Sequence, residues 1–443
     1  MSNSQRNVEN FILDTKWEDF PVEVKEQAVK CFLDLCGVFC AGIKSKSTNI
    51  SSEFAHSNFS GNEATMWPIG KKASLIGATL ANASCVNAVD MDDGYNLLMG
   101  HPGAGVFGGL LSAAEYSNCS YGEFLTALVI GYETAIRQGI AQQDYYNFYH
   151  STGAYAPFGT AACVGRLLKL TKGEITSALS ISDYYAPMVP CLRSIKSPSM
   201  NKDGIYLGSQ LGMQAVLLAK AGATGSDYIM LDEEYTKYRN NLGSEYYFLG
   251  LYFKFYACCR WAHSAIEAAR VIMSKHEFEL SDIKSIHVEG FGASGDLFSG
   301  YPRNEEEAQY NLRYPIAAVF VYGDCGPLQV TGDAFLNPDV LRVMDKISFV
   351  ANLEYESLFP ERRICKMTLV LHDSSTFVSG ECEPMGEKDV TMLDIQRKYA
   401  KVMADVMDAE KSLAIQKWIL CHDLDKPMKG FFSLLSYGLG ISA

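Results

Sequence analysis

The stretch HPGAGVFGGLLSAAEYSNCSYGEFLTALVIGYETAIR, residues His101 to Arg137, contains the signals for two successive helices. The first is expected to begin at Pro102, because proline suits the first turn of a helix. Its many glycines and alanines allow neighbouring helices to approach closely. The second should follow Ser120, where Ser120 and Glu123 match a capping box and apolar residues recur from Leu125 to Ile136. The stretch therefore predicts helices packed against helices.

Helical patterning covers most of the first half of the chain. Residues 22–41 carry apolar residues at three- and four-residue spacings after Pro21, and Thr171 with Glu174 forms a second capping box. Helices are therefore expected to dominate up to about Leu218.

The pattern changes after about Phe248. Residues 283–291 alternate between apolar and polar, and residues 365–382 are typical of a strand, a turn and a second strand. Helical signals return from about Thr391. We therefore expect a mainly α fold with an α+β insertion. The expected units are a large all-helical domain built from both chain ends, residues 1–250 and 398–443, and a smaller α+β lid domain, residues 251–397.

Composition and charge exclude several classes of protein. A net charge of −13 over 443 residues argues against non-specific nucleic-acid binding and against a basic membrane-binding surface. No apolar run approaches the roughly 20 residues that span a bilayer, and the first residues lack a signal-peptide pattern. The 13 cysteines include no Cys-x-x-Cys pair, which argues against a zinc ribbon. We expect a cytoplasmic protein with no nucleic-acid or membrane partner.

Three carboxylates lie close together at Asp90, Asp92 and Asp93, and His101 follows them. An EF-hand calcium loop starting at Asp90 would need glycine at its sixth position and glutamate at its twelfth, and neither is present. No His-x-x-x-His or His-x-Glu pattern supports a transition-metal site. The sequence therefore predicts no metal.

The glycines after His101 formally match a dinucleotide-binding motif, Gly103-x-Gly105-x-x-Gly108. That motif requires a preceding strand, whereas residues 73–89 are typical of a helix, and no P-loop lysine follows. Helix packing explains these glycines better.

His101 is expected at the N-terminal edge of the helix that starts at Pro102. The free N–H groups and the dipole at that end disfavour a protonated imidazole. A neutral His101 could therefore act as a base. The alternative is that His101 only caps the helix.

Other titratable residues stand in unusual settings, and each also has a structural interpretation. Lys202 and Lys254 would then be solvated surface charges. His263 would be a helix cap, and Tyr314 a core aromatic residue with a bonded hydroxyl. The full set is His150, Lys202, Lys254, Arg260, His263 and Tyr314.

Taken together, these motifs resemble the MmgE/PrpD family, which includes 2-methylcitrate dehydratases, cis-aconitate decarboxylase and iminodisuccinate epimerase. Their order and approximate spacing fit over nearly the whole chain. The motifs are Asp90-Met-Asp-Asp93, His101-Pro-Gly, GYETAIR, His150-Ser-Thr-Gly, Ser199-Met-Asn-Lys202, Lys254-Phe-Tyr-Ala-Cys-Cys-Arg260, His263-Ser-Ala-Ile-Glu-Ala-Ala and Leu312-Arg-Tyr314.

The resemblance implies an active site between the helical domain and the lid, in a homodimer that needs no metal or organic cofactor. Its implied catalytic residues are Asp90, His101, His150, Lys202, Lys254 and Tyr314. Its implied substrate-binding residues are Lys202, Lys254, Arg260 and His263. Two positions depart from family patterns: decarboxylase-like members have threonine where this chain has Gly94, and dehydratase-like members often have tryptophan where it has Asn201.

The reactions of this family labilise a bond on carbon next to a carboxylate, and negative charge then develops that the enzyme must stabilise. We expect Lys202 and Lys254 to hold the carboxylates of a small anionic di- or tricarboxylate. His101 or His150 would remove the proton. The expected function is a cofactor-free lyase, most like a 2-methylcitrate dehydratase. The alternatives are an epimerase of an iminodisuccinate-like acid, a cis-aconitate decarboxylase-like enzyme and a catalytically silent binding protein.

Overall fold

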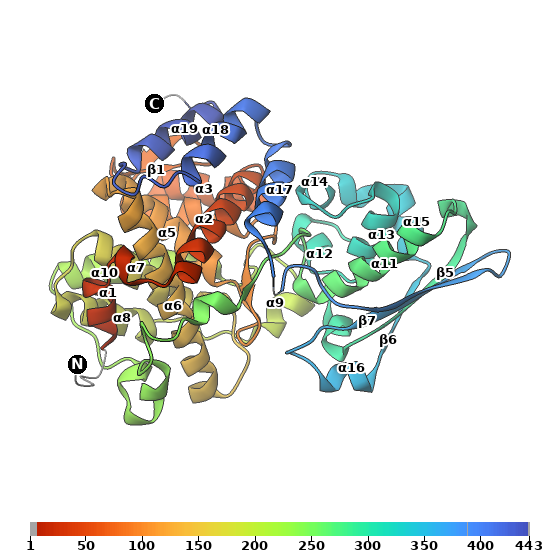
Figure 1. The fold of residues 1–443 in the computed structure, drawn as a ribbon, viewed down its shortest axis with the longest axis horizontal. Helices are drawn as coiled ribbons and strands as arrows, with labels where there is room; N and C mark the ends of the chain where they lie inside the picture. The colour runs from red at the N-terminus through yellow and green to blue at the C-terminus, as the bar shows by residue number, and fades with distance from the viewer. Residues whose placement is uncertain (1–6, 388, 442–443) are drawn as a thin grey trace.

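The helices of the first half pack into one lobe of the molecule (Figure 1). The computed structural model describes residues 7–387 and 389–441. In this lobe α4 packs on α5, α5 packs on α7, and α10 contacts both α4 and α7. Its helices are α1 (Val8–Asp14), α2 (Val22–Gly42), α3 (Lys46–Asn58), α4 (Leu75–Val86), α5 (Pro102–Ser117), α6 (Tyr121–Tyr146), α7 (Ala156–Leu167), α8 (Lys172–Tyr184), α9 (Leu192–Lys196) and α10 (Ile205–Lys220).

The predicted helix starts are confirmed, and local side chains explain them. Pro102 is the first residue of α5, and the Ser120 hydroxyl accepts from the backbone N–H of Glu123 at the start of α6. Thr171 and Glu174 form the full reciprocal capping box before α8. The small residues of α5 also act as expected, because a side chain in place of Gly108 would overlap the backbone of α4.

The second lobe carries a four-stranded sheet in the order β6-β5-β7-β8. β5 runs parallel to β6 and antiparallel to β7, with Ile286 opposite both Ile347 and Leu369. α11 packs on β7 and β8, and α13 packs on α11 and α15. The strands are β5 (Ile283–Gly290), β6 (Ile347–Ala351), β7 (Cys365–Leu371) and β8 (Thr376–Cys382). The helices are α11 (His263–Lys275), α12 (Glu305–Gln309), α13 (Arg313–Tyr322), α14 (Pro327–Val330), α15 (Pro338–Met344) and α16 (Leu353–Ser357).

The C-terminal helices return to the first lobe. α17 (Met392–Met403) packs along α2, and α18 (Ala409–Ile419) packs on both α19 (Lys429–Leu439) and α2. Figure 1 shows α17 at the junction of the lobes, with α18 beside α2. The expected fold class, mainly α with a smaller α+β part, is confirmed. The bounds of the insertion at 251 and 397 stay a prediction.

Two short antiparallel ladders complete the structure. β1 (Ala64–Met66) pairs with β2 (Lys71–Ala73) within the helical lobe. β3 (Gly94–Tyr95) pairs with β4 (Leu251–Tyr252), which joins the segment after α4 to the segment that leads into the second lobe.

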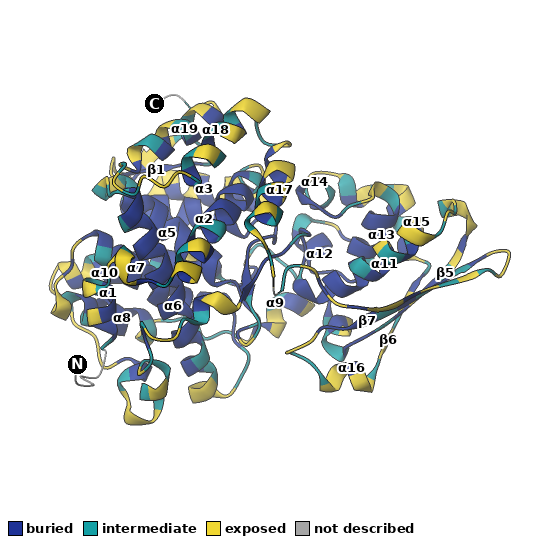
Figure 2. Ribbon diagram, in the orientation of Figure 1, coloured by how far each residue is buried: buried dark blue, intermediate teal, exposed yellow. Residues whose placement is uncertain are grey.

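The hydrophobic core is centred on the helical lobe, where α5 and α6 are buried along nearly their whole length (Figure 2). Phe32 of α2 contacts Phe107, Phe124 and Phe431, so α2 and the last helix, α19, share one aromatic cluster. All 13 cysteines are free thiols. Among the described residues, none of the helices has the length and apolarity needed to span a bilayer.

Candidate active site

The loop between α4 and α5 carries the three carboxylates and His101. Asp90 and Met99 adopt left-handed backbone conformations, with φ of 52° and 49°. Non-glycine residues rarely occupy this region, and such residues cluster at functional sites. The loop returns to the start of α5, where the Asp93 carboxylate accepts from the N–H of Gly103 at 3.2 Å and from the hydroxyl of Tyr132. The carboxylates and His101 are therefore held against one helix end.

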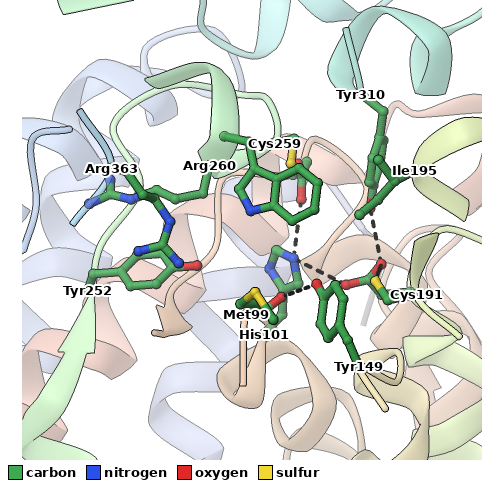
Figure 3. Close-up of a pocket in the computed structure, with 13 residues that line it drawn as sticks. Met99, His101, Tyr149, Cys191, Ile195, Tyr252, Cys259, Arg260, Tyr310 and Arg363 are labelled. Carbon is green, nitrogen blue, oxygen red and sulfur yellow. Dashed lines mark hydrogen bonds and ion pairs between the residues drawn. The ribbon is translucent and has the colours of Figure 1, made fainter. Parts of the chain in front are cut away.

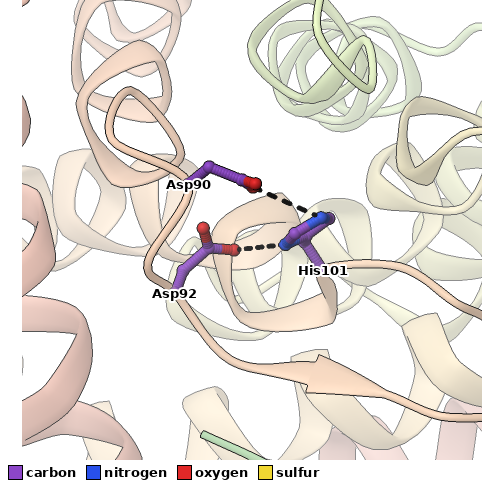
Figure 4. A group of neighbouring side chains, drawn as sticks. All are labelled: Asp90, Asp92 and His101. Carbon is purple, nitrogen blue, oxygen red and sulfur yellow. Dashed lines mark hydrogen bonds and ion pairs between the residues drawn. The ribbon is translucent and has the colours of Figure 1, made fainter. Parts of the chain in front are cut away.

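The His101 imidazole lies among three carboxylates, and Figure 4 shows two of them, Asp90 and Asp92. Its Nδ1 is 2.9 Å from Asp92 Oδ2, and its Nε2 is 3.4 Å from Asp203 Oδ2 and 3.7 Å from Asp90 Oδ1. Burial lowers the pKa of His101, but the charges of Asp92 and Asp90 and the hydrogen bond with Asp92 together outweigh this effect, so the pKa is raised. The expected neutral His101 is therefore wrong, since these contacts outweigh the helix end and favour an imidazolium.

Lys254 neutralises the carboxylate of Asp90. Its Nζ lies 2.9 Å from Asp90 Oδ1, and both side chains are almost fully buried. Burial lowers the pKa of Lys254, but Asp90 and Asp92 raise it above its usual value. The structural alternative, a solvated surface lysine, is therefore wrong, because Lys254 is a buried ion-pair partner.

Asp90, Asp92 and His101 each offer one possible metal-ligand atom within 4.8 Å of the others. Asp90 is paired through Oδ1 with the Lys254 ammonium, and Asp92 accepts from His101 and Asn87, so Asp90 Oδ2 alone of these carboxylate oxygens lacks a protein partner. A cation added here would be repelled by Lys254 and by a protonated His101. The donor set therefore does not fit a resident metal ion.

A small cavity opens beside His101 (Figure 3). Its volume is about 20 Å³, room for about one water molecule. Asp90, His101 and Asp203 line it from the helical lobe, and Arg260 and Arg363 line it from the other side. The cavity thus lies between two walls. We call the first the acidic wall, formed by His101 and the carboxylates of Asp90, Asp92 and Asp203 around it, and the second the cationic wall, formed by Arg260 and Arg363.

The cationic wall is built around Tyr252. The guanidinium carbons of Arg260 and Arg363 lie 4.5 and 5.8 Å from the centre of its ring. Arg260 pairs with Glu387 at 2.8 Å, and Arg363 donates to the side chain of Asn96 at 2.5 Å. The Nε atoms of both arginines are buried and have no hydrogen-bond partner. Guanidinium N–H groups left in this way suit a planar carboxylate ligand.

Asp203 is the third carboxylate of the acidic wall and was not predicted. Tyr310 donates to its Oδ1 at 3.4 Å and Thr152 to its Oδ2 at 3.3 Å. Burial raises the pKa of Asp203, although His101 counters part of that rise. A raised pKa makes this carboxylate a stronger base than a solvated aspartate.

Lys202 is buried next to this site but does not line the cavity. Its ammonium donates to the carbonyls of Asn87 and Ala88 and to the side-chain oxygen of Gln309. Burial lowers its pKa. Lys202 instead lines a separate cavity of about 460 Å³ with Arg193 and Tyr206. In this structure, therefore, neither Lys202 nor Lys254 reaches the cavity beside His101 as a carboxylate anchor.

Three other predicted residues also lie outside the cavity. The ring nitrogens of His150 lie 3.3 and 3.2 Å from the carbonyls of Ser151 and Gly139, and burial lowers its pKa. His263 binds the carbonyl of Cys258 at 3.1 Å. Tyr314 is buried and donates to the carbonyl of Gln329, which matches its structural interpretation.

The sequence thus predicted Asp90, His101 and Arg260, but Asp203, Tyr252 and Arg363 are among the lining residues that it did not predict. Asp203 directly follows Lys202, so the neighbouring lysine motif was the available signal. Tyr252 and Arg363 lie far apart in the chain and carried no motif.

Two protein-family models match the chain. The model of the MmgE/PrpD N-terminal domain matches residues 6–244, and that of the MmgE/PrpD C-terminal domain matches residues 256–424. The chain belongs to the MmgE/PrpD family. In this MmgE/PrpD protein the acidic wall comes from the N-terminal family domain, and Arg260 and Arg363 come from the C-terminal one.

Two curated relatives align with almost all of this MmgE/PrpD chain. The cis-aconitate decarboxylase-like protein oryM of Aspergillus oryzae is 22% identical, and the alignment covers 96% of each chain. A cis-aconitate decarboxylase of Aspergillus terreus is also 22% identical, over 92% of this chain and 90% of its own. These relatives support an enzyme of the dehydratase and decarboxylase type without defining its substrate.

Proposed function

We propose that this MmgE/PrpD protein is a lyase that removes water from a small hydroxylated di- or tricarboxylate. The observation that supports it is the placement of an acid and a base on one wall, His101 Nε2 and Asp203 Oδ2, 3.4 Å apart. The Asp203 carboxylate takes a proton from the carbon next to a substrate carboxylate. His101 donates a proton to the leaving hydroxyl on the adjacent carbon, and an alkene and water form.

Asp203 and His101 can also return each other to their starting protonation states after the reaction. Asp203 ends with one more proton and His101 with one fewer, and their contact lets the proton return directly. Asp92 holds Nδ1 throughout, so Nε2 keeps facing the substrate. This arrangement needs no metal or organic cofactor.

Arg260 and Arg363 hold the substrate carboxylates in this proposal. They lie across the cavity from His101 and have buried Nε donors without partners (Figure 3). A cation near the carboxylate also stabilises the negative charge that develops when the neighbouring proton leaves. The substrate class is therefore a polyanionic acid, and 2-methylcitrate is the first candidate from the family resemblance.

Decarboxylation is the second candidate, and the names of the two relatives favour it. In that reaction His101 would protonate the carbon that loses carbon dioxide. Gly94 weighs against it, because a Cβ at this position would overlap the hydroxyl of Tyr252. The threonine of decarboxylase-like members has no room there while Tyr252 lies between the arginines. Epimerisation has less support, since it requires groups on both faces of the carbon and the acid and base here share one wall.

The test is to incubate the pure protein in deuterated water with 2-methylcitrate, citrate, cis-aconitate and an iminodisuccinate-like acid, followed by proton NMR. Dehydration predicts new alkene signals from a hydroxylated acid. Carbon dioxide release from cis-aconitate would replace the proposal with decarboxylation. Deuterium gain with inversion and no alkene would replace it with epimerisation, and no reaction with any acid would refute it. Light scattering tests the homodimer that the resemblance implies.

A further inference from the structure

Lys398 is a buried lysine of the C-terminal helix α17 that reaches the loop of the acidic wall. Only 2% of its side chain is exposed. Its Nζ lies 2.5 Å from Asp34 Oδ1 on α2 and donates to the carbonyl of Met91 at 2.8 Å. The ring of Phe255, the residue after Lys254, has its centre 6.0 Å from the same nitrogen. Lys398 therefore contacts three segments that are remote in sequence.

The carbonyl that Lys398 holds belongs to the residue between Asp90 and Asp92. Asp90 has a left-handed backbone, and its carboxylate pairs with Lys254. Asp92 binds Nδ1 of His101 at 2.9 Å. A shift of the Met91 peptide would therefore move both carboxylates relative to the imidazole. Displacements of about 1 Å in a catalytic group can reduce a rate by about 100-fold.

Lys398 does not touch the cavity, and it is not needed to neutralise the groups that line it. Asp90 already has Lys254, and Asp92 already has His101. The counter-ion of Lys398 is Asp34, whose carboxylate has no hydrogen-bond partner other than this ammonium. The buried Asp34–Lys398 pair therefore brings an ammonium to the Met91 carbonyl without changing the net charge of that region.

We propose that Lys398 is a positioning residue that fixes the Asp90–Asp92 loop from the C-terminal helix and so keeps His101 aligned for proton transfer. The inference rests on the proposed function in one respect, that His101 is the acid of the reaction. It assigns a role in the site to α17, a helix that lies at the junction of the lobes and contributes nothing to the cavity lining (Figure 1).

The test compares four variants. Lys398→Met removes the ammonium but leaves Asp34 buried without a counter-ion, which itself costs stability. The double variant Asp34→Asn/Lys398→Met removes both charges and so avoids that cost. Lys398→Arg keeps the charge and should restore part of the activity. Lys401→Met is the matched control, because Lys401 lies on the same helix but pairs with Asp324 near the surface.

We expect kcat of the double variant to fall by about 10- to 100-fold, with KM changed by less than about threefold. Lys401→Met should keep wild-type kcat and KM. A double variant that folds and retains wild-type kcat would overturn the proposal.

The second readout is the pKa of His101, followed by NMR of the labelled imidazole without any substrate. The double variant loses a cation and an anion that lie 2.5 Å apart, so their direct effects on this pKa oppose each other. Loosening of the Asp92 contact would instead lower it, by about one unit, because burial then dominates. A lower pKa in the double variant supports positioning, and an equal or higher pKa refutes it. If the wild type turns over no acid, the proposed function fails, while this measurement still decides the role of Lys398.

Discussion

The two walls of the cavity differ in how far the protein itself satisfies their polar groups. On the acidic wall, each buried carboxylate has a partner within the protein, as Asp92 has His101 and Asp90 has Lys254. On the cationic wall, Arg260 and Arg363 have partners for their terminal nitrogens but leave both Nε groups without one. A wall whose charges are compensated can keep a proton donor in a fixed state. A wall with unmet donors can bind an anion from outside.

The largest expected effect comes from His101→Asn, which removes the proton donor at Nε2. We expect kcat to fall by about 100- to 10,000-fold with a small change in KM, the range typical of a general acid. Steady-state kinetics measures this. His150→Asn is the comparison, because His150 lies outside the cavity and should cost less than about tenfold. Equal losses in both variants would show that the acidic wall has been placed on the wrong histidine.

Arg363→Lys tests the cationic wall. Lysine keeps the positive charge but loses the planar fork of donors that matches a carboxylate. We expect KM to rise by about 10- to 100-fold, with a smaller loss in kcat, because charged hydrogen bonds contribute about 1.5–3 kcal/mol. Calorimetric binding of a polycarboxylate inhibitor gives an independent value. Unchanged binding would mean that the substrate carboxylate lies elsewhere.

The state of His101 predicts the pH dependence of the reaction. An acid must be protonated to act, and the carboxylates raise the pKa of His101 above the usual histidine value of about 6.5. Activity should therefore fall about tenfold per unit above that raised pKa, and it should also fall at low pH, where Asp203, the proposed base, becomes protonated. A pH profile of kcat checks this. A profile that rises with pH in the same range would indicate that His101 acts as a base in the first step.

Asp93 should produce a smaller effect, on stability. Burial raises its pKa to about 7, although the Tyr132 hydroxyl opposes the rise. Below about pH 4 the group is protonated in both states and has no effect. As pH rises from about 4 to 7, the unfolded chain loses this proton first, so the folded state is progressively destabilised. Relative to Asp93→Asn, the unfolding free energy of the wild type should fall by more than about 1 kcal/mol over that range. Urea titrations at each pH measure both unfolding free energies. The same pH dependence in the wild type and in Asp93→Asn would contradict the prediction.

The smallest effect is expected from Lys196→Ala. Lys196 of α9 pairs with Asp296 of the other lobe at 3.2 Å, but both side chains are about half exposed. Exposed pairs contribute little, so the unfolding free energy should change by less than about 0.5 kcal/mol. Thermal unfolding measures this. A larger change would mean that the contact between the lobes depends on this ion pair.

Helix ends and the hairpin could be predicted because neighbouring residues decide them. Ser120 and Thr171 cap the helices that follow within one turn. The strands β7 and β8 are joined by a short turn and pair with each other. The β3–β4 ladder could not be predicted, since Gly94 meets Tyr252 across more than 150 residues and each strand has two residues.

The sequence predicted the site residues that one loop supplies. It missed residues that only the packing of distant segments brings to the cavity. Asp90 and His101 come from a single loop, whereas Asp203 and Arg363 reach the cavity from distant segments. The predicted protonation state of His101 was wrong for a related reason. A helix end typically contributes 0.3–1 kcal/mol, whereas a buried carboxylate 2.9 Å away acts far more strongly, and only the fold reveals that contact.

The cavity of about 20 Å³ has a consequence for kinetics. A di- or tricarboxylate is many times larger than one water molecule, so the form described here must open before an acid can enter. The measured affinity then equals the intrinsic affinity scaled by the population of the open form. The second-order rate of substrate capture should accordingly stay below the diffusion limit. Variants that favour the open form would bind faster without any new contact to the substrate.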